Sequence, residues 1–287
     1  MVPGILLVNL GTPQAPTREA VRRYLAEFLS DPRVVALPRF VWLPILHGIV
    51  LRTRPALSAE KYAAIWTPEG SPLAVNTARL ATLLARRTGA PVGYAMRYGT
   101  PGLRAALATG PEPGVVVPLY PQYSRSTTES VRDCLPRGIR MIESFHDHPA
   151  YIAALASRLR AHWEAHGPAE RLLLSFHGLP QRAVDRGDPY ETQCRTTAAL
   201  LAASLGISGA QFQVSFQSRF GAAKWLQPYT QPLLVQLARS GVRRVDVMCP
   251  GFVCDCLETL EEINIVARRA FLEAGGAQLR YIPCLND

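Results

Sequence analysis

Short apolar runs alternate along the chain with longer segments in which apolar residues recur every three or four positions. The runs consist mostly of β-branched and aliphatic residues, which is typical of strands buried on both faces of a parallel sheet. They read GILLVNL, VGYAM, GVVVPLY, IRMIESF, RLLLSF, QFQVSF, RRVDVMC and LRYIPCL. This alternation predicts an α/β fold in which right-handed helical crossovers join parallel strands.

Three of the intervening segments have clear helical periodicity. The first has its apolar residues on one helical face, at Val21, Tyr24, Leu25, Phe28 and Leu29. We expect Thr17 to cap this helix and Asp31-Pro32 to end it. Two further helices are expected at about 149–166 and 190–205. Each half of the chain holds about four apolar runs, and the segment FHDHPAYIAA at 145–154 starts a new helix. We therefore predict two domains, 1–147 and 148–287.

Composition narrows the classes of function. The chain has 287 residues, of which 48% are hydrophobic, and a formal net charge of +9. The basic residues are scattered and form no dense run, so we expect small anionic molecules or anionic lipid headgroups as partners and no nucleic acid. The sequence contains no GxGxxG, GxxxxGK[ST] or GxSxG motif, which removes the usual support for dinucleotide-binding, P-loop and α/β-hydrolase functions.

The cysteines and the apolar stretches bear on location. Six cysteines in a chain of this size are expected to be reduced thiols of a cytoplasmic protein. The apolar run near the first residue is too short for a signal peptide, and the stretch from Phe40 to Leu51 contains Pro44 and His47. We expect a soluble protein that can contact a membrane surface.

Polar and aromatic residues follow almost every predicted strand. In parallel sheets, ligands bind beyond the carboxyl ends of the strands. The segments there are Asn9-Leu10-Gly11, Arg97-Tyr98-Gly99, Tyr120-Pro121-Gln122-Tyr123, His177-Gly178-Leu179-Pro180, Gln217-Ser218-Arg219 and Cys249-Pro250-Gly251-Phe252. We expect them, with Trp225, to line a cleft between the two domains that suits a flat, aromatic, anionic ligand.

The segment LLLSFHGLP places His177 where a buried strand meets a turn. A histidine there can accept protons or bind a metal through its neutral ring. It can equally be a structural residue whose ring is bound by a backbone carbonyl.

The segment CPGFVCDCLETLEEI carries a row of acids. On an α-helix Asp255, Glu258 and Glu262 would share one face, opposite a buried stripe of Leu257, Leu260, Ile263, Ala267 and Phe271. Two interpretations stay open: a capping box of Asp255 and Glu258, or an acidic row that attracts a divalent cation. The spacing of Cys249, Cys254 and Cys256 matches no strong cluster motif.

Together, several segments carry a family resemblance over almost the whole chain. LLVNLGTP, GSPL, YPQYSRSTT, LSFHGLP, GDPYETQC, FQSRFG, KWLQPYT and CPGFVCDCLETLEEI resemble the ferrochelatases, class II chelatases that insert Fe²⁺ into a porphyrin, and most of all the proteobacterial protoporphyrin type. The resemblance implies the chelatase fold, with two similar Rossmann-like domains of parallel sheet and helices.

The resemblance also implies roles for individual residues. His177 would accept a pyrrole proton or handle the metal, and Glu258, with Glu262, would form an acidic path for metal and protons. The residues implied to contact the porphyrin are Leu10, Arg54, Ser71, Arg97, Tyr98, Tyr123, Trp225 and Phe252. Fe²⁺ is then a substrate, no cofactor is required, and no iron–sulfur cluster is expected, because Arg125 stands where some cluster-bearing relatives hold a cysteine.

Alternatives remain at this stage. Coproporphyrin III is a possible substrate, although relatives that use it often carry a tyrosine where this chain has Leu10. A cobalt or nickel chelatase that acts on a sirohydrochlorin-like ring is another alternative, but such chains are usually shorter or have a second histidine at the metal, and no other histidine here lies in a matching motif. A non-catalytic porphyrin or heme carrier would not need both His177 and Glu258. The family usually continues past the Cys-Leu-Asn-Asp segment, with which the given sequence ends, into a C-terminal helix, and this sequence has Val266 where some relatives hold another acid or a histidine.

Overall fold

The fold is α/β, as the hydrophobic pattern predicts. A computed structural model describes residues 4–109, 113–209 and 211–287. The chain divides into two compact units, each with its own parallel sheet. Unit 1 comprises 1–120, 124–144 and 286–287, and unit 2 comprises 121–123 and 145–285. The main crossing between them thus lies between Ser144 and Phe145, whereas the boundary proposed from the sequence lies at residue 147.

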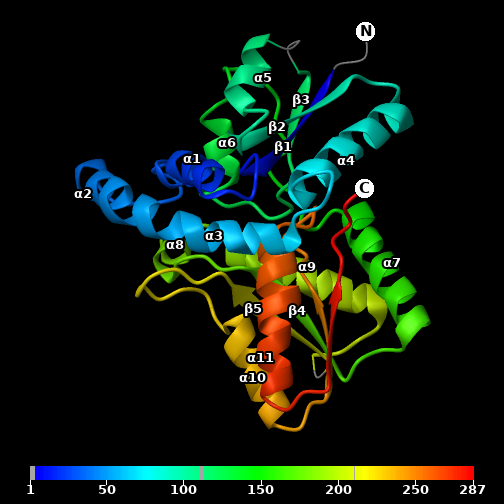
Figure 1. The fold of residues 1–287 in the computed structure, drawn as a ribbon. Helices are drawn as coiled ribbons and strands as arrows, with labels where there is room; N and C mark the ends of the chain where they lie inside the picture. Colours follow the sequence, from blue (N-terminus) through cyan, green and yellow to red (C-terminus); the bar gives the residue numbers. More distant parts are fainter. Residues whose placement is uncertain (1–3, 110–112, 210) are drawn as a thin grey trace. The chain divides into compact units, whose positions relative to one another are not determined.

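Unit 1 is built on a three-stranded parallel sheet with the order β2-β1-β3. Leu6 and Val8 of β1 pack on α5 and α6, and Asn9, which points to the opposite face, donates a hydrogen bond to Thr77 of α4. Helices therefore cover both faces (Figure 1). The elements are β1 (Ile5–Thr12), α1 (Arg18–Leu29), α2 (Arg39–Ile45), the π-helix η1 (Leu46–Val50), α3 (Leu51–Ile65), α4 (Pro72–Thr88), β2 (Val92–Gly99), α5 (Leu103–Thr109), β3 (Val115–Pro118) and α6 (Thr128–Arg132).

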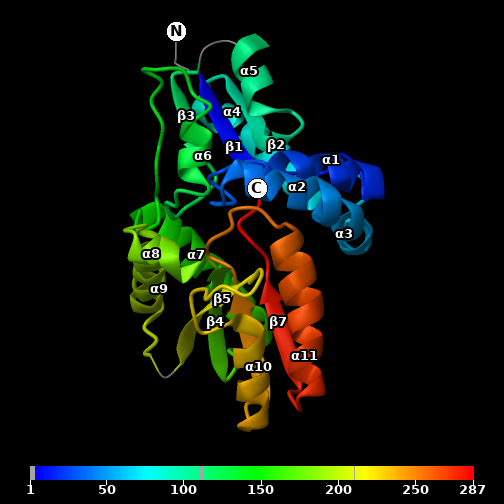
Figure 2. The same ribbon diagram turned by 90° about the vertical axis from the view of Figure 1, so that its left-hand side faces the viewer.

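Unit 2 is built on a four-stranded parallel sheet with the order β5-β4-β6-β7 (Figure 2). Its elements are α7 (Pro149–His166), β4 (Arg171–His177), α8 (Gln181–Asp185), α9 (Tyr190–Leu205), β5 (Phe212–Gln217), α10 (Thr230–Arg239), β6 (Arg244–Met248), the π-helix η2 (Glu258–Ala267), α11 (Arg268–Glu273) and β7 (Gln278–Ile282).

The central strand β4 shows how the sequence divides the core of unit 2 into two layers. Leu172, Leu174 and Phe176 pack with α7 and α9, whereas Leu173 packs with α10, η2 and α11. Side chains alternate between the two faces of a strand. His177, two strand positions beyond Ser175, therefore ends β4 on the face that η2 covers.

Most elements expected from the sequence are present. Seven apolar runs form β1 to β7, Thr17 accepts a hydrogen bond from the Ala20 amide at the start of α1, and α7 and α9 span the expected ranges. The strand predicted from IRMIESF is wrong, because Met141 forms only a single bridge with Val116. The neighbouring strand β3 ends at Pro118, which has no N–H to extend the ladder.

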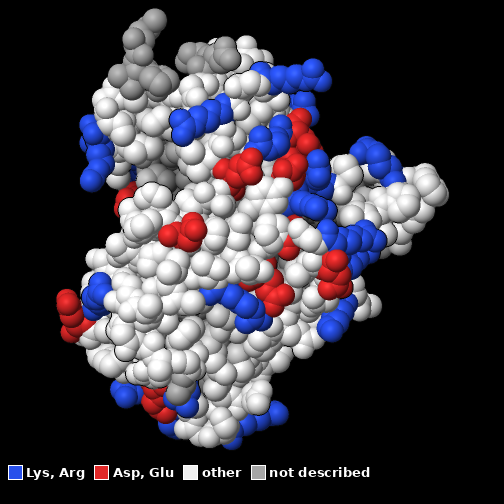
Figure 3. Space-filling view, turned by 180° about the vertical axis from the view of Figure 1, so that it is seen from behind, with Lys and Arg blue, Asp and Glu red and all other residues white. Residues whose placement is uncertain are grey.

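A helical lobe formed by α2, η1 and the start of α3 projects from the rest of unit 1. Pro44 lies inside α2, and the chain widens into the π-helical turn η1 directly after it. The lobe exposes large apolar side chains, among them Phe40 (82%), Ile49 (60%) and Leu57 (64%). In Figure 3 its tip, on the right, is mostly uncharged and has basic side chains beside it.

Candidate functional site

The predicted catalytic residues lie at the carboxyl edge of the sheet in unit 2. β4 ends at His177, its register partner in β5 is Gln217, and the segment after β6 runs from Cys249 to Phe252. The edge of a parallel sheet at which its strands end is where α/β folds bind ligands. These residues therefore lie at the carboxyl edge of the sheet, as the sequence predicts.

The ring of His177 is oriented by the next residue along the chain. Its Nδ1 lies 2.7 Å from the carbonyl oxygen of Gly178. A carbonyl oxygen can only accept a hydrogen bond, so Nδ1 carries the proton of the neutral ring and Nε2 keeps its lone pair. The carbonyl contact expected by the structural interpretation of His177 is therefore present, and it leaves Nε2 free of this bond, as the functional interpretation requires.

Gly178 is required by its surroundings. A Cβ atom at this position would lie 2.6 Å from the carbonyl oxygen of Gln217 and 3.1 Å from Cε3 of Trp225. The Gly178 amide donates to the same Gln217 carbonyl over 2.7 Å. The close approach of backbone and indole therefore fixes the turn that follows His177. On another side, the ring of Phe252 lies 6.5 Å from that of His177, measured between centroids.

The acidic segment forms a π-helix, and the α-helix expected there is wrong. Hydrogen bonds from residue i to i+5 make η2 wider than an α-helix, and such turns occur often at functional sites. Ile263, Ala267 and Phe271 of the expected apolar stripe are buried, but Leu257 and Leu260 are only half-buried. Glu261, which was not part of the expected acidic face, is buried instead.

The capping interpretation of Asp255 is also wrong. No side chain caps the start of η2. The Oδ1 atom of Asp255 instead accepts hydrogen bonds from the Tyr281 hydroxyl, from Thr259 Oγ1 at 3.1 Å and from the Cys284 amide at 3.4 Å. The bonds to Tyr281 and to the Cys284 amide tie the segment before η2 to the segment that forms β7 and follows it.

Gln217 and Ser218 connect the end of β5 to the acids of η2. The buried amide Nε2 of Gln217 donates to the Glu258 carbonyl oxygen at 2.7 Å and to Glu262 Oε2 at 3.4 Å. Ser218 donates its amide to Glu262 Oε1 at 2.7 Å and its hydroxyl to Oε2. It adopts a left-handed backbone with φ 64°, an unusual conformation for serine. Neutral donors therefore hold Glu262 beside the end of β5.

The neighbouring thiol is not available as a thiolate. Burial, and then the charge of Glu258, raise the pKa of the Cys256 thiol, which therefore remains protonated. All six cysteines are buried, and none of them forms a disulfide. Within the described residues, no group of three or more His, Cys, Asp and Glu side chains is arranged to hold a metal ion.

Two more of the predicted porphyrin contacts belong to unit 2. Trp225 pairs with Pro180 in an isolated bridge and packs over Gly178, and its Nε1 is buried without a partner among the described residues. Tyr123 is held by its amide, which donates to Gln193 Oε1 of α9 at 2.7 Å. Both residues are therefore held by contacts within unit 2.

The other predicted contacts lie in unit 1. Arg97 and Tyr98, at the end of β2, both bind the carboxylate of Asp31, and Tyr98 is almost fully buried. Ser71 is buried against Thr12, with 2.8 Å between their hydroxyl oxygens.

Leu10 and Arg54 complete the predicted contacts in unit 1. Leu10 is half-buried, and its amide donates to Asn9 Oδ1 at 2.9 Å. Arg54 is also half-buried, and burial lowers the pKa of its guanidinium.

Sequence reasoning missed several residues that organise these edges. Asp31 was identified only as a helix terminator, and Tyr281 only as part of a strand. Gln217 and Ser218 were noted at a strand end, but nothing in the pattern paired them with Glu262. A polar residue directly after an apolar run, as Gln217 is after QFQVSF, was the one available signal.

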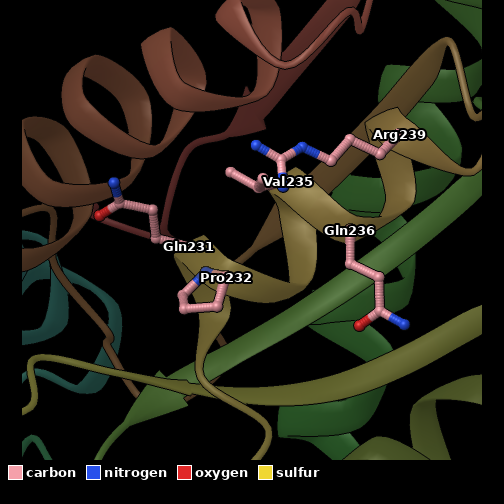
Figure 4. A pocket seen from close by; sticks show the side chains of 5 residues that line it. All are labelled: Gln231, Pro232, Val235, Gln236 and Arg239. Atoms are coloured by element: carbon pink, nitrogen blue, oxygen red, sulfur yellow. The ribbon is translucent and has the colours of Figure 1, made fainter.

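The surface grooves lie elsewhere. A shallow groove of about 660 Å³ follows one side of α10 and is lined by Gln231, Pro232, Val235, Gln236 and Arg239 (Figure 4). All five side chains come from one helix, and none is a predicted site residue. The chemistry of the strand ends, and not the depth of this groove, therefore defines the candidate site.

The comparison with protein families decides the identity of the chain. Its residues 2–287 match the family model for ferrochelatase. The chain belongs to the ferrochelatase family. It is 58% identical to the ferrochelatase of Azoarcus sp. (strain BH72), 56% to that of Aromatoleum aromaticum and 53% to that of Bordetella pertussis. Each match covers 99% of this chain and 83% of the relative.

Solved structures show the same chelatase fold at much lower identity. CbiX, the terminal enzyme for biosynthesis of siroheme in denitrifying bacteria, aligns with a TM-score of 0.51 at 16% identity, covering 99% of this chain and 92% of that one. DR2241 from Deinococcus radiodurans, a multi-domain protein with structural similarity to chelatases, aligns with a TM-score of 0.53 at 15% identity, covering 100% of this chain and 52% of that one. The predicted fold class is confirmed.

Proposed function

We propose that this ferrochelatase family member inserts Fe²⁺ into protoporphyrin IX and releases protoheme. The observation that carries the proposal is His177, whose Nδ1 is bound to the Gly178 carbonyl so that Nε2 is a proton acceptor at the carboxyl edge of β4. The identity to curated ferrochelatases over nearly the whole chain supports the same reaction.

The reaction requires proton removal. Free-base porphyrin plus Fe²⁺ gives the metalloporphyrin plus two protons: two pyrrole N–H bonds break, and the iron exchanges its previous ligands for bonds to the four ring nitrogens. In the proposed mechanism, Nε2 of His177 accepts a pyrrole proton. Glu258 and Glu262 carry protons away and attract Fe²⁺, which is a substrate here. Oxygen ligands of this kind hold such a cation loosely enough for the porphyrin to take it.

The porphyrin contacts remain those implied by the family. Trp225, Phe252 and Tyr123 would lie against the ring from unit 2, and Leu10, Arg54, Ser71, Arg97 and Tyr98 are the proposed contacts from unit 1. A rigid aromatic surface can bend the macrocycle toward its transition-state shape by using binding energy from remote contacts. Leucine at position 10 favours protoporphyrin IX over coproporphyrin III as the substrate.

The lobe of unit 1 supports peripheral contact with a membrane. Residues 32–59 contain four arginines and no acidic residue, and the lobe exposes Phe40 and Ile49. Exposed apolar side chains beside basic ones bind the interface of anionic bilayers. In the described part of the chain, no helix combines the length and the apolarity needed to span a bilayer.

A vesicle experiment tests the lobe. Phosphatidylserine vesicles should sediment the wild-type protein better than phosphatidylcholine vesicles, and the double change Phe40→Ser and Ile49→Ser should remove the difference. Leu83→Ser is the matched control, because Leu83 is an exposed apolar residue of α4 away from the lobe. Equal sedimentation of all three proteins would refute the membrane contact.

We also propose that the protein carries no iron–sulfur cluster. The family resemblance supports this proposal, because Arg125 stands where some cluster-bearing relatives hold a cysteine. Freshly purified, porphyrin-free protein should lack the sulfur-to-iron absorbance band near about 400 nm.

The proposed reaction is tested directly by turnover. Purified protein, protoporphyrin IX and Fe²⁺ are mixed without oxygen, and the loss of porphyrin fluorescence is followed. Multiple turnovers that disappear in His177→Ala are the expected result. Tight porphyrin binding without turnover would instead identify a carrier.

A further inference from the structure

A buried charge pair lies at the carboxyl edge of the sheet in unit 1. Asp31 follows α1, and its side chain reaches the end of β2, where Arg97 Nη2 donates to Asp31 Oδ2 at 2.5 Å. The side chains are only 7% exposed for Asp31 and 14% for Arg97. The same Oδ2 accepts from the Tyr98 hydroxyl at 2.8 Å and from Ser130 Oγ at 2.7 Å.

The guanidinium of Arg97 is held on several sides. Besides the bond to Asp31, its Nε donates to the Ser130 carbonyl oxygen at 2.8 Å, and its Cζ lies 4.4 Å from the centroid of the Tyr98 ring. The second carboxylate oxygen of Asp31 accepts from the Arg33 amide at 2.8 Å. Arg97 is therefore locked in place, and its positive charge is compensated within unit 1.

We propose that Asp31 is a specificity-determining residue that masks the charge of Arg97, so that this edge of the sheet does not favour porphyrins with additional carboxylates. The proposal rests on the proposed function, in which Arg97 lies beside the porphyrin. An unmasked guanidinium would bind a carboxylate bidentately, whereas a closed ion pair exerts little net attraction. Asp31 would thus favour a porphyrin with two carboxylates over one with four.

The test is a double-mutant cycle that is measured with two porphyrins. Wild type, Asp31→Asn, Arg97→Met and the double variant are compared for coproporphyrin III, with four carboxylates, and protoporphyrin IX, with two. Zn²⁺ insertion gives kcat/KM, and fluorescence titration gives Kd without metal. The measured quantity is the preference for coproporphyrin III over protoporphyrin IX.

Opposite shifts are expected from the two single variants. Asp31→Asn, which unmasks Arg97, should raise the preference for the four-carboxylate porphyrin by roughly three- to tenfold. Arg97→Met, which leaves Asp31 uncompensated, should lower it by a similar factor. The double variant should return to the wild-type preference, because both charges are gone.

Two results would overturn the proposal. One is an unchanged preference in Asp31→Asn. The other is a double variant that behaves like Arg97→Met, which would make Arg97 a carboxylate ligand in its own right. If Asp31→Asn fails to fold, the comparison of Arg97→Met with the double variant still decides between these cases. If the wild type metallates neither porphyrin, the proposed function fails, and the Kd ratios still test Asp31.

Discussion

Each unit holds a partly buried carboxylate at the carboxyl edge of its sheet, and the two are treated in opposite ways. In unit 1, Asp31 is paired with Arg97, and the local charge is cancelled. In unit 2, the partners of Glu262 among the described residues are the neutral groups of Gln217 and Ser218, so its negative charge is kept. A retained negative charge attracts a cation, whereas a neutral edge suits a largely apolar ring. The same architecture thus provides two surfaces of different electrostatic character.

The largest effect is expected when the proposed proton acceptor of unit 2 is removed. His177→Ala should lower metal insertion by at least about a hundredfold, the contribution that a positioned base makes, while porphyrin binding stays measurable. Anaerobic turnover measures the loss of metal insertion, and porphyrin fluorescence titration measures the remaining binding. His166→Ala, at an exposed histidine of α7, is the control; normal turnover in His177→Ala would reject the assigned base.

The next change neutralises the acid at the start of η2. Glu258→Gln should lower kcat by about a hundredfold, because a carboxylate no longer carries protons or attracts Fe²⁺. Its free energy of unfolding should change by less than about 0.5 kcal/mol, since no side chain caps η2. Turnover and a melting curve are measured together. A large loss of stability would restore the capping interpretation.

Ionisation of Asp31, the paired carboxylate of unit 1, should contribute to the pH dependence of the free energy of unfolding. Burial raises the pKa of Asp31, but the hydrogen bonds from the Arg33 amide, Ser130 and Tyr98 and the charge of Arg97 outweigh it, so the pKa lies below its usual 3.8. A group whose pKa is lower in the folded state stabilises the protein above its unfolded-state pKa, and the contribution is lost as the pH falls through the folded-state pKa. The wild type should therefore lose stability below about pH 4 partly through Asp31.

Asp31→Asn isolates this contribution. The variant should melt at a lower temperature than the wild type near neutral pH, because Arg97 loses its partner. The gap between the two melting temperatures should narrow as the pH falls below about 4. Melting curves between pH 3 and 7 measure it, and a gap that stays constant over this range would contradict the assigned pKa.

The smallest effect on turnover is expected where a single hydrogen bond from a neutral donor to Glu262 is removed. Ser218→Ala deletes the hydroxyl that donates to Glu262 and keeps the amide bond at 2.7 Å. The loss should be about 1.5 kcal/mol of stability, because the acceptor is a carboxylate, with a modest decrease in turnover. Thermal melting and steady-state kinetics give both values. Ser208→Ala, at an exposed serine outside the site, is the control.

The hydrophobic pattern predicted the strands well because burial on both faces leaves a strong signal. The seven runs that became strands are central to their sheets or pair along much of their length, whereas IRMIESF interrupts its apolar residues with Arg140 and Glu143 and meets a strand that stops at Pro118. Motifs similarly located His177 and Glu258. They could not reveal that Asp255 binds Tyr281, because that pairing joins segments distant in sequence.

The sequence pattern also could not predict that η2 is a π-helix and not an α-helix. Acids four residues apart share a face in both α- and π-helices, so the spacing of Glu258 and Glu262 fits either. What distinguishes them is the environment of residues between, and only the structure shows that Glu261 is buried. The sequence did not predict the pairing of Asp31 with Arg97 either. Asp31-Pro32 already accounts for the end of a helix, so nothing in the pattern indicated a distant partner for Asp31.

The π-helical form of η2 has a consequence for the tolerance of this segment to insertions and deletions. Because an i→i+5 helix and an i→i+4 helix differ by one residue per closed ring, removing one residue between Glu258 and Glu262 would allow an ordinary α-helix to form. Glu258 and Glu262 would then lie three residues apart on a narrower helix and could not both keep their present hydrogen bonds to Gln217 and Ser218, although every residue type needed for the chemistry would still be present. In natural variants of this chain, a single-codon gap here is therefore expected to be far more damaging than a conservative substitution.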